Sequence, residues 1–340
     1  MPKISVIIPA YNVEKYIEKT LKSLMDQTFK DFEAIVINDG STDNTEKIIK
    51  EVLQDTEFQW KLINQENQGV SAARNRGIIE SKGEYISFLD ADDYYHPTFL
   101  EKMYNKAKEK DYDAVFCNYA LVTEKGKIIS IHKQPTEFIG VSLDGEKVLE
   151  LVLENKLSIC TESYICKKDI IIHNKIFYTK GSILGEDQEF WMKALFHAES
   201  VNNVSEVLVY YVQRKNSAIN RKQDLRVLHS FATCKRLVAY FERAEATNST
   251  INDLMKKKEL KSFFHNLFQL YRSPKIDDET LKKILQNKEI KDNLMKVKNL
   301  DLTISEQIFL FLLLKCPLSM RAINKFFINS IYNIKYSGYR

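Results

Sequence analysis

Roughly the first 120 residues alternate short apolar runs with segments whose apolar residues recur at helical spacing. The apolar runs predict β-strands at residues 4–8, 32–38, 60–65, 85–89 and 113–118. The periodic segments predict helices at 13–25, from Asn44 onward with Asp43 or Thr42 as N-cap, at 70–81 and from Pro97 onward. Strands separated by helices imply an α/β fold, with a mostly parallel sheet that helices cover on both faces.

The rest of the chain continues this pattern and then changes character. A hairpin is expected over 122–145 with its turn at 124–126, helices at 146–154 and 186–198, and a last strand at 207–213. Beyond Gln223 the sequence is helical nearly throughout, with many leucines and lysines and few glycines. We therefore expect an α/β domain over residues 1–220 and a helical region over residues 221–340, which 340 residues are enough to form.

Composition is that of an ordinary globular protein, with 44% hydrophobic and 28% charged residues. The net charge of +4 is unevenly distributed, because residues 252–340 hold 17 Lys/Arg against 9 Asp/Glu. This basic end favours an anionic partner such as phospholipid or nucleic acid, or else it is a solvated, lysine-rich helical surface. The five cysteines form no C-x-x-C pair, which favours reduced thiols in the cytosol over a disulfide framework or a zinc site.

Polar or acidic turns follow the predicted strands. Because the loops that leave the carboxyl ends of neighbouring strands converge, ligands of open α/β sheets bind there. The turns are Pro9–Asn12, Asp39–Asp43, Asn67–Asn75, Asp90–Asp93 and, much later, Gly185–Phe190. Successive turns thus offer an aromatic ring, several carboxylates and the start of a helix. Together they indicate one site that binds both a nucleotide and a metal.

The turn Asp90-Ala-Asp-Asp93 is rich in acid. Two unneutralised carboxylates about 4 Å apart repel each other by about 4 kcal/mol at an effective dielectric of 20. A divalent cation would remove that cost, and Mg²⁺ or Mn²⁺ favours carboxylate together with phosphate oxygens. A solvated turn that caps the helix at Pro97 is the alternative.

Each of the other turns offers a group that could bind a nucleotide, but the same group could also have only a structural role. Tyr11 could stack on a base or pack at the surface, and Asp39 could accept a base N–H or belong to a generic turn. Gly69 precedes a helix start, where free N–H groups and the helix dipole favour phosphate. Arg74 and Asn75 could reach the diphosphate or the carboxylates, and Arg74 could instead form a structural ion pair.

Taken in order, these segments resemble the family 2 glycosyltransferases. The matching segments are Val6-Ile-Ile-Pro-Ala-Tyr-Asn12, Asn38-Asp-Gly-Ser-Thr-Asp43, Asn67-Gln-Gly-Val-Ser-Ala-Ala-Arg-Asn75, Phe88-Leu-Asp-Ala-Asp-Asp93 and Gly185-Glu-Asp187. The resemblance covers roughly residues 3–220. It implies the GT-A fold and a metal-dependent, inverting transfer from a nucleotide-diphospho-sugar, most often a UDP-sugar. The C-terminal third looks like the variable helical tails of bacterial polysaccharide transferases.

By position, the resemblance implies a role for each motif residue. Asp92 would be the principal ligand of Mn²⁺ or Mg²⁺, and Asp187 the catalytic base, with Glu186 as its rival. Val212 and Gln213 stand where the family has an aromatic and a basic residue, ahead of the late segment that closes over the donor phosphates. The nucleotide-sugar would contact Pro9, Ala10, Tyr11, Asp39, Gly69, Arg74, Asp90, Ala91, Arg214 and Ser217.

The resemblance further implies transfer to a hydroxyl of a glycan or lipid-linked acceptor in cell-surface polysaccharide synthesis, without nucleic acid as a partner. A sugar nucleotidylyltransferase is one alternative, but it would carry a glycine-rich basic loop where this chain has Pro9–Val13. A catalytically inert, transferase-like partner or membrane-docking subunit is another. Such a subunit would have lost an acid from the turn at 90–93 or Asp187, and none is lost.

The C-terminal end combines an apolar run at 308–314, stopped by Lys315, with aromatic and basic residues. The run is far shorter than the roughly 20 apolar residues of a spanning helix. Residues 301–340 therefore predict a basic amphipathic helix in a membrane interface, or else helices that pack together or join an oligomer. Because the chain enters a strand at once, no signal peptide is expected. We expect a cytoplasmic protein that is peripheral on the inner face of the plasma membrane.

Overall fold

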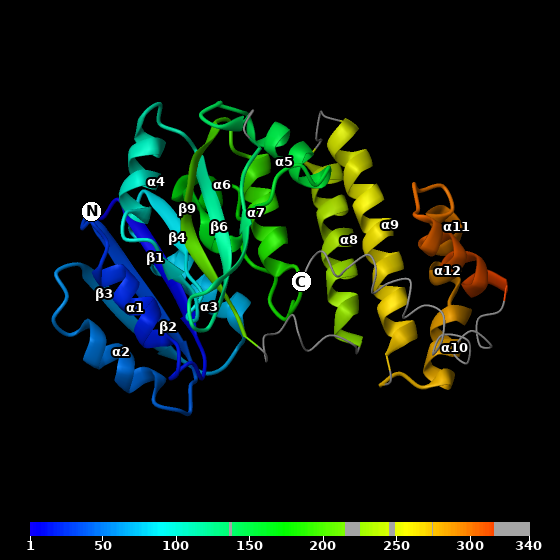
Figure 1. Cartoon of the computed structure of the whole chain (residues 1–340), viewed down its shortest axis with the longest axis horizontal. Coiled ribbons are helices and arrows are strands. Elements are labelled where there is room, and N and C mark those ends of the chain that lie inside the picture. Colours follow the sequence, from blue (N-terminus) through cyan, green and yellow to red (C-terminus); the bar gives the residue numbers. More distant parts are fainter. Residues whose placement is uncertain (136–137, 215–224, 245–248, 274, 316–340) are drawn as a thin grey trace. The chain divides into compact units, whose positions relative to one another are not determined.

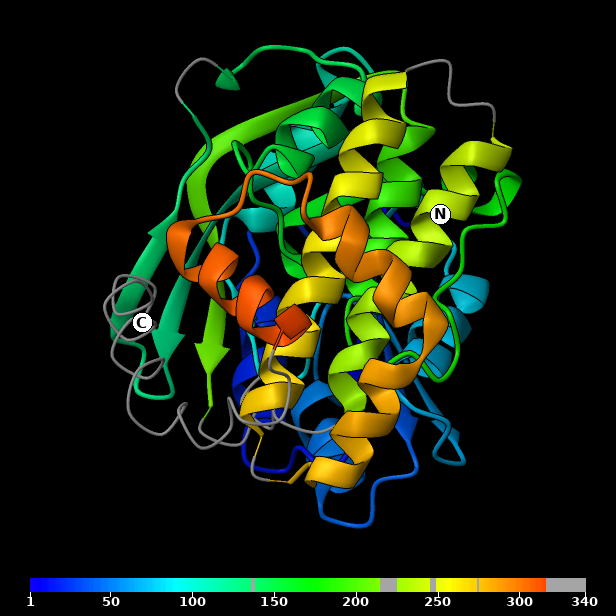
Figure 2. The same cartoon turned by 90° about the vertical axis from the view of Figure 1, so that its right-hand side faces the viewer.

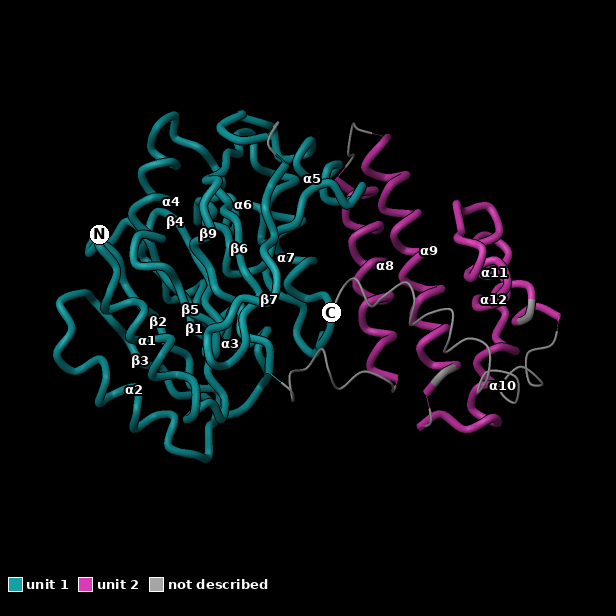
Figure 3. Tube along the Cα trace, viewed as in Figure 1, with its two compact units in different colours: residues 1–217 teal, residues 218–340 magenta. Residues whose placement is uncertain are grey.

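The computed structural model describes residues 1–135, 138–214, 225–244, 249–273 and 275–315 (Figure 1). The chain divides into two compact units, residues 1–217 and residues 218–340 (Figure 3). Among the described residues, the strands all belong to the first unit, and the second unit is helical.

Nine strands of the first unit form one sheet in the order β3-β2-β1-β4-β8-β6-β9-β5, with β7 paired to β6. The four strands β3, β2, β1 and β4 are parallel, whereas β8 is antiparallel to both of its neighbours, so the whole sheet is mixed. The strands are β1 (Ile4–Ala10), β2 (Phe32–Asp39), β3 (Gln59–Gln65), β4 (Tyr85–Phe88), β5 (Tyr94–Tyr95), β6 (Ala114–Thr123), β7 (Ile128–His132), β8 (Tyr164–Lys167) and β9 (Val201–Gln213).

Helices connect these strands in the alternation that the sequence predicts for the first half. The helices of the first unit are α1 (Ile17–Met25), α2 (Thr45–Leu53), α3 (Val70–Glu80), α4 (Phe99–Lys108), α5 (Gly145–Leu153), α6 (Lys168–His173) and α7 (Glu186–Phe196), with a short 3-10 turn, η2 (Thr161–Ser163), just before β8.

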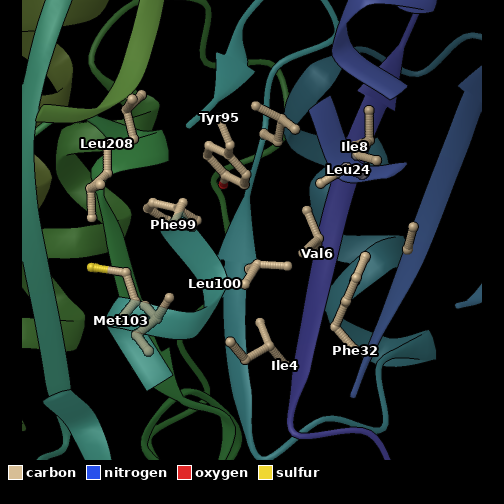
Figure 4. Packing of buried hydrophobic residues seen from close by; sticks show 14 of the residues in the cluster. Ile4, Val6, Ile8, Leu24, Phe32, Tyr95, Phe99, Leu100, Met103 and Leu208 are labelled. Atoms are coloured by element: carbon tan, nitrogen blue, oxygen red, sulfur yellow. The ribbon is translucent and has the colours of Figure 1, made fainter. Parts of the chain in front are cut away.

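A buried apolar core holds β1 and β2 against α1 and α4. Tyr95 and Phe99 stack within it, with ring centroids 3.9 Å apart. Burial on both faces explains why these strands are continuous apolar runs in the sequence. Figure 4 shows this core through Ile4, Val6, Ile8, Leu24, Phe32, Tyr95, Phe99, Leu100, Met103 and Leu208.

Helix α1 begins four residues later than expected, after a turn in which the carbonyl of Val13 accepts the N–H groups of Tyr16 at 2.9 Å and Ile17 at 3.0 Å. Asn12 has a left-handed backbone with φ of 50°. Thr45 Oγ1 accepts the N–H of Val13 at 2.9 Å, and Asp43 Oδ2 accepts the N–H of Glu14 at 3.1 Å. The expected N-cap of α2 is also corrected, since Asn44 occupies that position. Asp43 still contacts the helix start, since its Oδ1 accepts the N–H of Thr45 at 3.0 Å, and its Oδ2 joins the first two turns.

Strand β8 and helix α6 were missed by the sequence analysis. Strand β8 has only four residues and pairs with β4 and β6, which are distant in the chain. The sequence of such a short strand gives little local indication of β-structure, because both of its antiparallel partners lie far away in the chain. Its insertion brings η2 next to the turn that follows β4, which matters for the site.

Helix α3 packs closely on β1 through Gly77. A Cβ atom at this glycine would lie 2.3 Å from Cγ2 of Ile7, which is fully buried. Glycine therefore allows the helix to approach the strand, and it sets the position of the side chains that α3 presents at the sheet edge.

The second unit consists of α8 (Leu228–Arg243), α9 (Ser249–Arg272), α10 (Asp278–Gln286), α11 (Lys288–Val297) and α12 (Ile304–Lys315), preceded by a short turn, η4 (Leu225–Val227). Figure 2 shows the long helices α8 and α9 side by side. Within the described ranges, we find no helix with both the length and the apolar character needed to span a bilayer.

Helix α12 has two apolar faces. Phe309, Leu310 and Leu313 are buried in the core of the second unit. A second stripe is exposed to solvent and consists of Ile304, Ile308, Phe311 and Leu314, with Phe311 61% exposed. Residues 316–340, which hold most of the predicted membrane-interface segment, lie outside the described residues.

Candidate active site

The candidate site lies at the edge of the sheet where the parallel strands β1, β2, β3 and β4 end. The turns after β1 and β2 are joined by side chains. Ser41 Oγ accepts the N–H of Asn12 at 3.0 Å, and Asn12 Oδ1 accepts the N–H of Thr42 at 2.8 Å. The first two polar turns of the sequence therefore form one connected rim, as the convergence of parallel strand ends requires.

The end of β1 carries three residues that the sequence analysis assigns to the nucleotide. Pro9 and Ala10 are the last two residues of the strand and are buried. Tyr11 follows directly and is 50% exposed. Its ring is therefore open to a stacking partner at the rim.

Asp39 ends β2 and is 2% exposed. Its carboxylate accepts three hydrogen bonds, from the side chain of Gln65 at 2.7 Å and from the N–H groups of Gln68 at 2.9 Å and Gly69 at 2.8 Å. An ionised carboxylate can accept about four. Asp39 therefore fixes the loop that leads into α3, and room for one further donor is left.

Gly69 precedes the first residue of α3 and has a φ of 87°, in the left-handed region that side chains disfavour. Nothing lies within 4 Å of where its Cβ would be. The start of α3 is thus an open helix N-terminus at the rim, where N–H groups and the helix dipole favour an anion.

Arg74 is a buried cation, with 4% of its side chain exposed, that links two acidic turns. Its Nη2 lies 2.8 Å from Oδ1 of Asp90, and its Nη1 lies 3.5 Å from Oε1 of Glu186. The guanidinium also stands 5.1 Å from the ring centroid of Tyr178. Arg74 therefore ties the turn after β4 to the start of α7, and its partner Glu186 lies 112 residues after it in the sequence.

Asn75 has a different partner from the one expected. Its side-chain amide donates to the carbonyl of Tyr178 at 2.9 Å and accepts the N–H of the same residue at 2.8 Å. These two bonds satisfy the side chain in the interior, so Asn75 fixes the segment that leads to α7.

Asp92 is paired with Arg214, the residue that follows β9. The distance from Asp92 Oδ2 to Arg214 Nε is 2.5 Å, and the guanidinium lies 4.9 Å from the ring centroid of Tyr16. Burial and the charge of Asp90 raise the pKa of Asp92 to about 6, against the lowering effect of Arg214. Ala91, between the two acids, is buried. Ser217, which the sequence analysis adds to this segment, lies outside the described residues.

The buried residues Asp93 and Glu162 form an acidic cluster with the half-buried Asp90, in which one carboxylate oxygen of each lies within 4.8 Å of the others. Asp93 Oδ1 also accepts the N–H of Val212 at 2.7 Å. Burial, followed by the charge of Asp90, raises the pKa of Glu162 to about 8. Groups of carboxylates so arranged are typical of sites for hard divalent cations.

Glu162 was not singled out by the sequence analysis. It belongs to η2, before the missed strand β8, and it reaches the turn after β4 only because β8 pairs with β4. A glutamate beside an apolar strand is a weak signal of burial, and nothing local relates it to residues some 70 positions earlier.

Asp187 and Glu186 lie in the first turn of α7, after Gly185, which has a φ of 80°. Thr161 Oγ1 donates to Asp187 Oδ2 at 3.4 Å, whereas Glu186 faces Arg74. Burial and the charge of Asp187 raise the pKa of Glu186 to about 7. The two neighbouring acids thus have separate partners, and η2 lies between Asp187 and the acidic cluster.

The chain is similar to known glycosyltransferases. The family model of glycosyl transferase family 2 matches residues 5–170. The putative glycosyltransferase EpsH of Bacillus subtilis (strain 168) is 34% identical over 225 residues, which cover 65% of this chain and 64% of that protein. The uncharacterized glycosyltransferase RT0329 of Rickettsia typhi is 33% identical over 239 residues, which cover 67% of this chain and 71% of that protein. The chain spans 64%, 42% and 63% of the lengths of three curated relatives that it matches.

Solved structures share the fold. The crystal structure of S. aureus TarS 1–349 in complex with UDP-GlcNAc superposes with a TM-score of 0.61 and 21% sequence identity, covering 87% of this chain and 81% of that chain. This likeness confirms the expected GT-A fold. Together with the one-third identity to RT0329 over 71% of that protein, it confirms the resemblance read from the motifs. The chain belongs to the family 2 glycosyltransferases.

Proposed function

We propose that this protein transfers a sugar from a nucleotide-diphospho-sugar, namely a UDP-sugar, to a hydroxyl of a glycan or lipid-linked acceptor, with inversion at the anomeric carbon. One observation carries the proposal. Arg74 and η2 both link the acidic turn at 90–93 to the start of α7. The carboxylates that suit a metal ion and Asp187 therefore belong to one site.

The residues present fit a divalent cation. Three carboxylates lie within 4.8 Å, and Oε2 of Glu162 is buried without a hydrogen-bond partner. Asp92 would hold the cation as its principal ligand once Arg214, which now pairs with Oδ2, has turned away from its carboxylate. When bound, Mn²⁺ or Mg²⁺ supplies positive charge to the leaving diphosphate.

The rim residues would bind the nucleotide. Tyr11 offers its exposed ring to the base, beside Pro9 and Ala10. Asp39 holds the loop before Gly69 and has one acceptor position left for a base N–H. The open start of α3 faces the same edge and would take the diphosphate. The complex of TarS with UDP-GlcNAc supports a UDP-sugar as donor, without naming the sugar for this chain.

Arg74 would act as an organising residue for the donor side of the site. It holds Asp90 and Glu186 in place and carries the positive charge closest to them. Arg214 would turn from Asp92 toward the diphosphate when donor and cation are bound, together with Ser217 of the following segment. An arginine suits this task because its planar fork contacts phosphate and carboxylate alike.

Asp187 would be the general base. It takes the proton of the acceptor hydroxyl while that oxygen forms a bond to the anomeric carbon. The bond from this carbon to the diphosphate breaks on the opposite face, and the nucleoside diphosphate leaves with the electron pair. A single displacement inverts the anomeric centre and needs no protein nucleophile. Thr161 holds the carboxylate of Asp187 from the side of η2.

A lipid-linked acceptor in cell-surface polysaccharide synthesis would place the enzyme at the cytoplasmic face of the membrane. The exposed apolar stripe of α12 supports such a contact, since apolar helix faces insert at the interface between headgroups and acyl chains. Basic residues add attraction to anionic lipid.

The experiment is release of nucleoside diphosphate from a panel of nucleotide-sugars, with Mn²⁺ and crude lipid-linked acceptor. Transfer would be read from the product, whose anomeric configuration is opposite to that of the donor if the displacement is single. Retained configuration, or release that chelation of the metal does not affect, would contradict the proposal.

A further inference from the structure

Glu162 is a buried carboxylate that reaches the acidic turn from outside it. The residue is 2% exposed and belongs to η2, a segment with no sequence link to the turn at 90–93. One of its oxygens lies within 4.8 Å of oxygens of Asp90 and Asp93. Its Oε2 is buried and has no hydrogen-bond partner.

The arginine side chains that the structure describes near this carboxylate are paired with other acidic residues. Arg74 contacts Asp90 and Glu186, and Arg214 contacts Asp92. Among the ion pairs of the described residues, none involves Glu162 or Asp93. A buried carboxylate next to two others, with an oxygen that nothing satisfies, is costly unless a further positive group enters the cluster.

The backbone holds Glu162 firmly in this position. Ser163 Oγ accepts the N–H of Cys160 at 3.1 Å and donates to its carbonyl at 2.9 Å, which closes the turn. Strand β8 follows at once and pairs with β4 on one side and β6 on the other. A carboxylate placed so rigidly suits a metal ligand, because ligands must be held close to the productive geometry.

We propose that Glu162 is a direct ligand of the divalent cation, acting with Asp90 and Asp93. The cation would then be held by carboxylates from two separate segments, the turn after β4 and η2. This inference rests on the metal dependence in the proposed function. Since Thr161 of η2 also contacts Asp187, one short turn would position both the cation and the base.

The competing explanation is a structural pair in which Glu162 and Asp93 share a proton and bind no metal. Both explanations account for burial, but they differ in what a neutral isostere does. Glu162→Gln keeps the volume and removes one oxygen donor, so it weakens cation binding only if this oxygen is a ligand.

The test is titration of the full chain with Mn²⁺, without nucleotide, following the electron paramagnetic resonance signal of the free ion. We expect Glu162→Gln to raise the Kd for Mn²⁺ at least about tenfold. The matched control is Glu189→Gln, a glutamate that is also 2% exposed but pairs with Thr179 and Lys193 away from the cluster. This control should bind Mn²⁺ like the parent chain.

Thermal unfolding of the same proteins gives a second readout. Without metal, Glu162→Gln should be at least as stable as the parent, because the amide removes a buried charge and can donate to Asp90 or Asp93. Mn²⁺ should raise the Tm of the parent and of Glu189→Gln more than that of Glu162→Gln. An equal Kd and an equal rise in Tm would overturn the proposal, as would a parent chain that binds no Mn²⁺.

Failure of this inference can be told from failure of the proposed function. If the parent uses nucleotide-sugars with Mn²⁺ while Glu162→Gln binds Mn²⁺ normally, Glu162 is not a ligand and the function stands. If the parent binds Mn²⁺ through Glu162 but uses none of the nucleotide-sugars, the cation site stands and the function is wrong.

Discussion

Asp187 and Glu186 are adjacent in sequence, yet their side chains face different groups. Glu186 lies against the buried guanidinium of Arg74, where it balances charge. Asp187 contacts only the hydroxyl of Thr161 and the N–H of Gln188 among described partners. The residue without a buried cation beside it is the better candidate for accepting a proton, because a base must be able to change its charge during the reaction.

We expect Asp187→Asn to lose at least about 10²-fold in kcat while it still folds and binds UDP with Mn²⁺. Asparagine keeps the shape and can still accept the N–H of Gln188 through its amide oxygen, but it cannot take a proton. Glu186→Gln is the control and should keep more activity. Steady-state kinetics and UDP binding by calorimetry measure both. An active Asp187→Asn beside an inactive Glu186→Gln would assign the base to Glu186.

Asp92→Asn should lose metal-dependent turnover and remain folded. The residue lies in a turn at the sheet edge, so the substitution removes one oxygen of the proposed metal ligand without opening a cavity in the core. Turnover at several Mn²⁺ concentrations, together with circular dichroism, tests this expectation. Near-normal turnover in Mn²⁺ would show that the cation does not depend on Asp92.

At the scale of elements, α3 supplies both the open N-terminus and Arg74, and Gly77 sets how closely this helix approaches β1. Gly77→Ala should destabilise the protein by about 1–2 kcal/mol. Overpacking against Ile7 costs about 1–3 kcal/mol, and the better helix propensity of alanine offsets up to about 1 kcal/mol.

Urea unfolding measures this change. Ile79→Ala, on the exposed face of the same helix, is the control and should shift stability by no more than about 0.5 kcal/mol. If Gly77→Ala were as stable as the parent, the close contact between α3 and β1 would not be a constraint.

The exposed stripe of α12 gives a test of membrane contact that leaves the core intact. Removal of residues 301–340 would also delete Phe309, Leu310 and Leu313, which are buried in the second unit, so truncation could unfold that unit. The double substitution Ile308→Asp and Phe311→Asp changes only exposed positions. We expect it to lower binding to anionic vesicles by tenfold or more, because it replaces inserted apolar surface with negative charge.

Met295→Asp is the matched control, since Met295 is also exposed and lies on α11 of the same unit. Co-sedimentation with vesicles rich in anionic lipid measures all three proteins. Equal binding of the double variant and the parent would assign the stripe of α12 to another use, such as packing against a second copy of the chain.

The sequence predicts well those helices and strands whose characteristic pattern lies within their own residues. The parallel strands β1, β2 and β4 are largely apolar runs bounded by turns, and the structure has them, together with the more polar edge strand β3, within a few residues of the expected ends. Strand β8 was missed because its pairing partners lie far away in the chain. The start of α1 was misplaced because a turn precedes the helix, and this turn is anchored at Val13 and Glu14 to Thr45 and Asp43, some 30 residues later.

The same distinction applies to the site. Residues in motifs, such as Asp90 and Asp92, could be found from the sequence because their turns follow recognisable strands. Glu162 could not be found, since only the long-range pairing of β8 brings it to the cluster. The partners that hold Asp39 and Asn75 were equally hidden, because hydrogen bonds to the backbones of distant loops depend on the completed fold.

For the whole molecule, a ligand that binds only the folded state should raise its stability. UDP together with Mn²⁺, at about 100 times the Kd, should add about 2.7 kcal/mol, and either component alone should add less. Thermal unfolding of the full chain tests this. Equal stabilisation by UDP with Mn²⁺ and by UDP with a chelator would mean that nucleotide binding does not involve the cation.

The most direct test of the central claim is the rate of UDP release from a panel of UDP-sugars, measured for the parent and for Asp187→Asn with crude lipid-linked acceptor. We expect at least one donor to be consumed by the parent in Mn²⁺, with release abolished by chelation and reduced at least about 10²-fold in Asp187→Asn. If no nucleotide-sugar were consumed, or if Asp187→Asn released UDP as fast as the parent, this account of the site would be contradicted.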